Sequence, residues 1–174
     1  EFASFAQYPE VLHAVFTRAG GASSGPFHSL NVGGLVGDDP ATVRANHDLI
    51  FTTLGIRREQ VVTASQVHSA NVAVVGSAQC GSIVPATDSL VTSTQGTALM
   101  LRFADCLPLM LYDPSRHVVA LVHAGWRGII AQVVPETLSS LRCVMGSEPR
   151  DIFAGLGQKG HNGALEIGPD VAQR

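Results

Sequence analysis

Residues 101–128 read LRFADCLPLMLYDPSRHVVALVHAGWRG, and this stretch decides the fold of the chain. It contains two apolar runs of strand length, Leu107–Tyr112 and Val118–Val122, each bounded by turn residues. Asp113-Pro114-Ser115 lies between them and predicts a turn, because proline pre-sets φ and aspartate accepts hydrogen bonds within its own turn. The stretch therefore predicts a β-hairpin of two buried strands.

The ends of this hairpin carry two reactive side chains. Cys106 directly precedes the first strand and His123 directly follows the second. Because a hairpin brings its open ends together, we expect the thiol and the imidazole to lie close in space. Pro108 has no backbone donor and favours the start of an edge strand, which keeps Cys106 at the mouth of the hairpin.

The residues that follow the hairpin predict a helix. Apolar residues from Ile129 to Leu141 recur at helical spacing, and Pro135 inside this run should kink the helix or begin it anew. Two glycines flank Trp126 and Arg127 at the helix start, where free N–H groups and the arginine could bind an anion. A tight strand-to-helix turn with Trp126 in the core explains the same residues, and the pattern alone favours it.

Length and composition limit the function classes. A chain of 174 residues predicts one domain over residues 1–174, and its 45% hydrophobic content predicts a well-buried core. The net charge of −3 gives no indication of the basic footprint of a nucleic-acid-binding protein, so we expect no nucleic-acid partner. No apolar run reaches membrane-spanning length, so we expect no membrane partner, and no leader pattern is recognisable, so secretion is not supported. An odd count of 3 cysteines argues against a disulfide framework and predicts a reducing, cytoplasmic location.

The remaining patterns predict one further helix and several strands. Asp39 is the expected N-cap of a helix over residues 41–54, with Gly55 as its C-cap. Its inward-facing residues are expected to be Val43, Leu49 and Ile50. The expected strands cover residues 11–17, 61–63, 72–75 and 87–92, with a further apolar run over 98–103.

His68, Cys106 and His123 form a candidate metal-binding triad. Two imidazoles and one thiolate suit a borderline-soft ion, zinc first and copper next, and three protein ligands with one open position are typical of a catalytic site. The same residues also allow a Cys106 nucleophile with a histidine base. Asp105 beside Cys106, or Asp88 upstream, could orient an imidazole or act as a base. Asp88 can also be interpreted as a turn residue without a role in the site.

Five blocks of sequence carry a resemblance to a known family. They are Ser29-Leu30-Asn31, Val36-Gly37-Asp38-Asp39, Gln66-Val67-His68, Ala104-Asp105-Cys106-Leu107-Pro108 and Val122-His123-Ala124-Gly125-Trp126-Arg127-Gly128, in this order. The chain thereby resembles the YfiH family over nearly its whole length. Members of this family are often described as laccase-domain or multicopper polyphenol oxidoreductase proteins. The resemblance implies a single α/β domain of mixed β-sheets in an α/β/β/α arrangement. The family continues beyond the position of Arg174, so the domain is expected to be incomplete at its C-terminal end.

The resemblance also implies a site and an activity. His68, Cys106 and His123 match the family's zinc ligands. Asn31, Arg44 and Asn46 match residues that line its pocket, and Arg127 matches the arginine after the tryptophan. The implied activity is phosphorolysis of adenosine, inosine, guanosine and methylthioadenosine, together with deamination of adenosine. The implied partners are purine nucleosides and phosphate; the oligomeric state is left open.

One stretch departs from the family pattern. Members usually carry Gly-Pro-x-Ile-Gly-x-Cys-x-Tyr-Glu-Val-Gly near the end of the domain, whereas residues 157–168 here read GQKGHNGALEIG. Gly163 or Ala164 stands at the cysteine position, and Leu165 stands at the tyrosine position. We therefore expect the far wall of the pocket to differ from that of the family.

Four functions remain open on the sequence. The favoured one is a zinc-dependent nucleoside enzyme whose catalytic residues are His68, Cys106, His123 and Asp105. A copper phenol oxidase is the second. Copper binds such ligands more tightly than zinc, so copper bound in vitro does not identify the native metal, and 7 histidines are few for several coppers. The third is a metal-free cysteine hydrolase, and the fourth is an inactive binding module.

Overall fold

The computed structural model describes residues 2–157, which form two β-sheets and their flanking helices. The parallel three-stranded sheet has the order β3-β1-β5, and the mixed five-stranded sheet has the order β2-β4-β7-β6-β8. The strands are β1 (Val61–Ala64), β2 (Val72–Val74), β3 (Ile83–Val84), β4 (Ser89–Thr92), β5 (Ala98–Met100), β6 (Leu107–Asp113), β7 (Val118–Ala124) and β8 (Phe153–Leu156). The helices are α1 (Pro40–Leu54), α2 (Trp126–Ile130) and α3 (Val133–Met145). Short 3-10 turns occupy Ala3–Phe5, Gly25–Phe27, Arg58–Gln60, Ser77–Gln79 and Pro149–Asp151.

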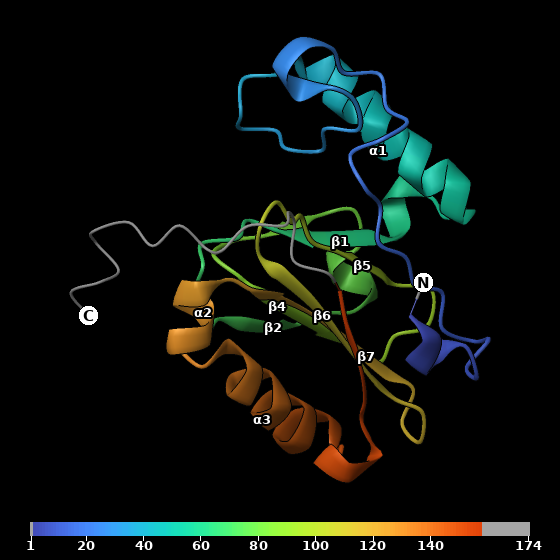
Figure 1. Ribbon diagram of the computed structural model, residues 1–174. Helices are drawn as coiled ribbons and strands as arrows, with labels where there is room; N and C mark the ends of the chain where they lie inside the picture. The colour runs from blue at the N-terminus through green and yellow to red at the C-terminus, as the bar shows by residue number, and fades with distance from the viewer. Residues whose placement is uncertain (1, 158–174) are drawn as a thin grey trace.

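The elements stack in the order α1, three-stranded sheet, five-stranded sheet and α3 (Figure 1). Three apolar clusters join these layers, because each element buries one hydrophobic face against its neighbour. Ile50 and Phe51 of α1 pack with Val61 of the first sheet. The two sheets meet through a cluster that includes Val62, Ala64, Leu90 and Leu121, and α3 covers the second sheet through Val133 and Leu141. The α/β fold with α/β/β/α layers is therefore confirmed.

The predicted hairpin is confirmed as β6 and β7. The two strands are antiparallel, with Leu107 opposite Ala124 and Asp113 opposite Val118. Asp113 closes the turn, because its Oδ1 accepts hydrogen bonds from the N–H groups of Ser115 (2.9 Å) and Arg116 (3.2 Å). The turn chemistry read from the sequence thus fixes the register of the two longest strands.

The expectation that Pro108 begins an edge strand is wrong, because β6 lies between β7 and β8. The β8 ladder begins at Leu109, one residue after the proline. Pro108 accepts a hydrogen bond from the Gly157 N–H at 2.8 Å through its carbonyl. The proline is tolerated inside the sheet because it lies at a strand start, where its missing donor removes only the last hydrogen bond between β6 and the β8 segment.

The predicted helix after the hairpin is divided in two. α2 ends at Ile130, Gln132 has a left-handed backbone with φ 69°, and α3 begins at Val133. Pro135 therefore lies in the first turn of α3, where a missing N–H costs nothing. Trp126 is half-buried instead of lying in the core.

The predicted helix with its Asp39 and Gly55 caps is confirmed as α1, whereas the strand expected over residues 11–17 does not form. This alternating segment runs without a sheet partner and lines a cleft with Phe51 and Met100. The edge strands β3 and β8, which no pattern predicted, form because neighbouring strands offer them free hydrogen-bonding groups.

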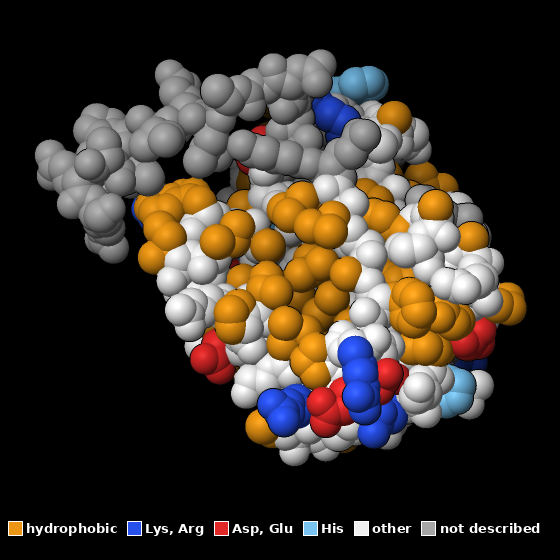
Figure 2. All heavy atoms as spheres, turned by 60° about the horizontal axis from the view of Figure 1, so that its bottom comes forward, with side chains coloured by type: hydrophobic (Ala, Val, Ile, Leu, Met, Phe, Trp, Pro, Cys, Tyr) orange, Lys and Arg blue, Asp and Glu red, His pale blue; other side chains and the backbone are white. Residues whose placement is uncertain are grey.

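Hydrophobic side chains also gather on the surface. With the lower side of Figure 1 turned forward, Figure 2 shows an apolar area on the face that carries α3, with charged side chains grouped below it. Exposed hydrophobic residues of the neighbouring elements include Ile129, Ile130 and Leu156. None of the helices in residues 2–157 has the length and apolarity needed to cross a bilayer.

The two leucines Leu90 and Leu49 test how the layers are held. Leu90 is 0% exposed between the two sheets, whereas Leu49, expected to face inward, is 45% exposed on α1. Leu90→Ala should lower the free energy of unfolding by about 3 kcal/mol, because it leaves a cavity in the core. Leu49→Ala should change it by less than about 1 kcal/mol. Urea unfolding of both variants measures the difference, and equal losses would contradict this description of the core.

Candidate metal centre

Three side chains from distant parts of the sequence meet at one end of the five-stranded sheet. His68 comes from the segment between β1 and β2, Cys106 directly precedes β6, and His123 lies near the end of β7. One ligand atom of each residue lies within 4.8 Å of those of the other two. The rings of His68 and His123 meet edge to face, with centroids 4.8 Å apart. The expected approach of the thiol and the imidazole at the hairpin mouth is therefore confirmed.

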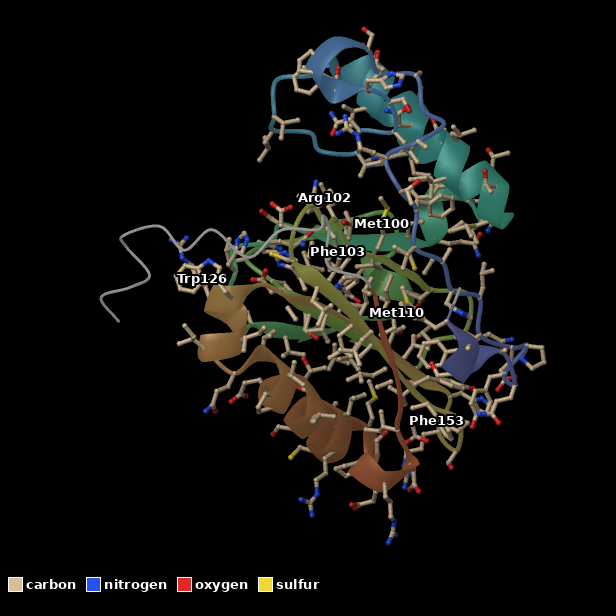
Figure 3. The ribbon with its side chains drawn as sticks, in the orientation of Figure 1. Met100, Arg102, Phe103, Met110, Trp126 and Phe153 are labelled. Atoms are coloured by element: carbon tan, nitrogen blue, oxygen red, sulfur yellow. The ribbon has the colours of Figure 1, made fainter. Side chains whose placement is uncertain are left out.

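An aromatic side chain lies against this cluster. The Phe103 ring lies 5.5 Å from that of His123, measured between centroids, and belongs to the apolar cluster between the sheets. Figure 3 shows Phe103 in this inner position and Trp126 at the start of α2, at the end of the sheets. The centre thus has an apolar wall on the side of the core. The sequence did not single out Phe103, because an aromatic residue in an apolar run carries no signal of a site.

Asp88 lies beneath the cluster and is 0% exposed. Its Oδ1 atom accepts a hydrogen bond from Nδ1 of His123 at 2.8 Å, and its Oδ2 atom accepts one from the Ser69 hydroxyl at 2.8 Å. Burial acts to raise the pKa of Asp88. The hydrogen bonds from the Ser69 backbone, His123 and the Ser69 hydroxyl outweigh burial, so the pKa lies below its usual value. Asp88 is thus an ionised buried carboxylate, and the interpretation of Asp88 as only a turn residue is excluded.

His123 is held neutral in this environment. Burial lowers its pKa and outweighs the opposite effect of the Asp88 hydrogen bond, while His68 lowers the pKa further. Because the carboxylate of Asp88 can only accept, Nδ1 of His123 carries the proton and Nε2 is left as an acceptor. A neutral imidazole with a free Nε2 is the form that binds a metal ion.

Cys106 is held as a thiol as long as no cation is near. Burial raises the pKa of Cys106, and the charges of Asp105 and Asp88 raise it further. An activated cysteine nucleophile needs the opposite shift, so the surroundings of Cys106 argue against the metal-free hydrolase. A thiolate and two imidazoles, once joined by a cation, are the donor set of a zinc site.

Gly125 keeps the centre open. A Cβ atom at this position would lie 2.9 Å from Sγ of Cys106 and 2.9 Å from Cδ2 of His68. Both distances are far below an ordinary van der Waals contact, so a side chain here must displace a ligand. The sequence showed this glycine only as part of a turn, because the clash depends on residues that are distant along the chain.

Two further predicted site residues flank the cluster. Asp105 is exposed in the bend next to Cys106, and it is Asp88 that contacts the His123 imidazole. Arg127 lies in the first turn of α2 with its guanidinium 4.9 Å from the centroid of the Trp126 ring. α2 has only 5 residues, so its dipole is small and Arg127 is the main cationic group of the expected anion site.

The pocket residues expected in the first third of the chain lie in the α1 layer. Asn46 is 1% exposed, accepts from the Ala22 N–H at 2.8 Å and donates to the Asn31 carbonyl at 2.8 Å. The Asn31 amide donates to Asp38 at 2.9 Å. Arg44 is exposed on α1. The structure therefore brings Asn31 and Asn46 together in a hydrogen-bond network that joins the loop before α1 to the helix. The three candidate metal ligands lie at the five-stranded sheet instead.

The departure from the family pattern lies almost wholly outside the described residues. Gly157 is described, and a Cβ there would lie 2.4 Å from Cγ of Pro108. Residues 158–168, with Gly163, Ala164 and Leu165, are outside the described range. The expectation for the far wall of the pocket therefore stays a prediction.

Comparisons with known proteins identify the family of the chain. A family model described as multi-copper polyphenol oxidoreductase laccase matches residues 12–174. A purine nucleoside phosphorylase of Streptomyces coelicolor is 43% identical over 146 residues, which cover 83% of this chain and 60% of that protein. The purine nucleoside phosphorylase YlmD of Bacillus subtilis is 36% identical over 155 residues, which cover 85% of this chain and 56% of that protein.

Two solved structures share the fold of the chain. YlmD from Geobacillus stearothermophilus matches with a TM-score of 0.80 and 35% identity, over 82% of this chain and 55% of that one. The Bacillus licheniformis protein YfiH matches with a TM-score of 0.79 and 33% identity, over 82% of this chain and 56% of that one. The chain spans less than two thirds of the length of each of these relatives.

The close approach at Gly125 predicts a loss of metal binding. Gly125→Ala should weaken zinc binding by at least about tenfold, because the new methyl group displaces a ligand. Gly34→Ala is the matched control, since a Cβ there meets nothing within 4 Å. Cys106→Ala deletes a ligand and therefore shows how far zinc affinity falls when one ligand is lost completely. Competition with a chromophoric chelator measures all three variants, and unchanged affinity in Gly125→Ala would contradict the three-residue site.

Proposed function

Since the chain belongs to the family described as multi-copper polyphenol oxidoreductase laccase, with YfiH and YlmD among its matched relatives, we propose that it acts on purine nucleosides. The proposed reaction is phosphorolysis of adenosine, inosine, guanosine or methylthioadenosine, with deamination of adenosine as a second activity. Relatives named purine nucleoside phosphorylase support this choice of substrate. The proposed cofactor is zinc, and copper can replace it in vitro.

One observation carries the proposal: His68, Cys106 and His123 converge beside a glycine that leaves their shared side clear. These residues would hold zinc, since two nitrogen donors and one sulfur donor fit its preference. When bound, zinc polarises an oxygen of the substrate or of a water molecule. His123 is suited to this role because burial lowers its pKa and because Asp88 holds its Nδ1 proton.

The neighbouring side chains have proposed roles in binding and proton transfer. Arg127, at the start of α2, binds the phosphate whose oxygen attacks C1′ of the ribose as the bond to the purine breaks. The exposed Asp105 carboxylate accepts the proton of the attacking water in deamination. Phe103, which packs near the His123 ring, and Trp126, at the start of α2, offer apolar ring faces for the base. Asn31, Arg44 and Asn46 stay proposed substrate-binding residues, and the buried Asn46 would act through the Ala22 and Asn31 segment that it binds.

The alternatives have less support. Phenol oxidation by several coppers needs several ligand groups, whereas residues 2–157 contain one cluster of candidate metal ligands, and zinc has no redox chemistry. The raised pKa of Cys106 argues against a metal-free hydrolase. An inactive binding module has no need for a glycine that keeps three ligands uncovered.

The proposal is tested on a single preparation loaded with zinc and free of copper. Inosine with phosphate should yield hypoxanthine and ribose-1-phosphate, adenosine should be converted, and a phenolic dye should stay reduced. Chromatography follows the nucleosides, and absorbance follows the dye. Oxidation of the dye with both nucleosides unchanged would establish the oxidase instead, and inactivity in all three assays would contradict the enzyme.

Arg127 allows the two nucleoside activities to be separated. Arg127→Ala should raise the KM for phosphate by about tenfold, because a charge-assisted contact to the anion is lost. Deamination uses no phosphate and should change by less than about twofold. Arg150→Ala is the control, since this arginine has an 85% exposed side chain and lies in the turn before β8. Equal loss of both activities in a folded Arg127→Ala protein would assign Arg127 to packing on Trp126.

A further inference from the structure

Asp88 connects the two segments that carry the histidine ligands. It directly precedes β4 and is fully buried. One of its side-chain oxygens, Oδ1, accepts hydrogen bonds both from the His123 ring and from the His68 backbone N–H. A single carboxylate thus contacts the His68 and His123 segments, which lie far apart along the chain.

The contact with His123 is fixed by strand register. Ser89 lies opposite Val122 in the antiparallel pair of β4 and β7, so Asp88 and His123 lie side by side. The His123 N–H donates to the Asp88 carbonyl at 2.8 Å, and the ring Nδ1 donates to Oδ1 at 2.8 Å. The main chain and the side chain of Asp88 together therefore fix the plane of the imidazole and leave Nε2 as the ring nitrogen available to a metal ion.

The contact with the His68 segment involves consecutive backbone donors. The N–H groups of Val67 (3.2 Å), His68 (3.0 Å) and Ser69 (2.8 Å) all point at the Asp88 carboxylate. His68 has a left-handed backbone with φ 61°, which is costly for a residue with a side chain. Its side chain is exposed, so packing contributes little to holding it in place. The carboxylate compensates for this backbone conformation by binding the N–H groups that the turn directs inward.

We infer that Asp88 is the positioning residue of the metal centre: its one carboxylate holds both histidine ligands at the spacing that a single ion requires. The inference rests on the proposed metal centre. Removal of a carboxylate that orients a ligating histidine commonly weakens metal binding by about 10- to 100-fold. Asp88 acts on two ligands at once, because the same carboxylate also holds the His68 turn.

Asp113 provides a matched control in the same sheet. It is also buried, ends β6 at the turn side of the hairpin and accepts hydrogen bonds from the N–H groups of Ser115 and Arg116. Replacing either aspartate by asparagine keeps the size of a buried side chain that binds backbone donors and turns one of its acceptor oxygens into an NH₂ group. Asp88 contacts the candidate ligands, whereas Asp113 contacts the turn.

The experiment compares Asp88→Asn and Asp113→Asn in the full chain. Zinc affinity is measured by chelator competition, and the Tm is measured without metal. The absorption spectrum of the cobalt-substituted protein reports the geometry of the ligands around the metal ion. Asp88→Asn should weaken zinc binding by about 10- to 100-fold and alter the cobalt spectrum. Asp113→Asn should lower the Tm to a similar degree and keep both the affinity and the spectrum of the parent protein.

The outcomes separate this inference from the proposed metal centre. A parent protein that binds no zinc would remove the metal centre itself. A parent that binds zinc and an Asp88→Asn variant that binds it equally well, with the same cobalt spectrum, would overturn the positioning role. If Asp88→Asn does not fold, Ser69→Ala decides, because it removes one donor to the carboxylate and leaves the ligands in place. About threefold weaker zinc binding in folded Ser69→Ala supports the inference, and unchanged affinity contradicts it.

Discussion

The hydrogen bond between the buried Asp88 carboxylate and the His123 imidazole is the constraint on which the site depends. A buried ionised carboxylate is stable only when donors surround it, and here the donors are the His123 ring, the Ser69 hydroxyl and the backbone of the His68 turn. The cost of burying the charge is thus offset by groups that also form the centre. The β4–β7 pairing places these groups together, so the layer structure and the site depend on the same register.

The donor atoms of the centre and their electrostatic surroundings fit a bound cation. Burial keeps His123 neutral and Cys106 protonated, and both residues can become ligands once a cation compensates for the loss of the thiol proton. Gly125 leaves room on the side that the ligands share. This combination favours the proposed metal-dependent enzyme over a cysteine hydrolase, and the relatives named purine nucleoside phosphorylase support the proposed substrates.

Local sequence signals determined a large part of the fold. The hairpin followed from two apolar runs and the Asp113-Pro114 turn, and α1 followed from its Asp39 and Gly55 caps, because each signal acts within a few residues. The meeting of Cys106 and His123 followed from the hairpin alone. The ordered sequence blocks indicated the family, which the family model and the relatives confirm. Zinc, the nucleoside substrates and the roles of Asn31, Arg44 and Arg127 remain proposals.

Tertiary structure decided what depends on contacts between distant residues. The alternating residues 11–17 predicted a strand that does not form, because a strand needs a partner edge that sequence pattern does not reveal. Pro108 suggested an edge strand, whereas β8 adds to β6 one residue after it. Asp88 had two interpretations in the sequence, and only the pairing of β4 with β7 placed its carboxylate against His123. The sequence by itself thus determined the candidate ligands and the hairpin, whereas the sheet register decided which buried charge holds them, because that contact joins segments far apart along the chain.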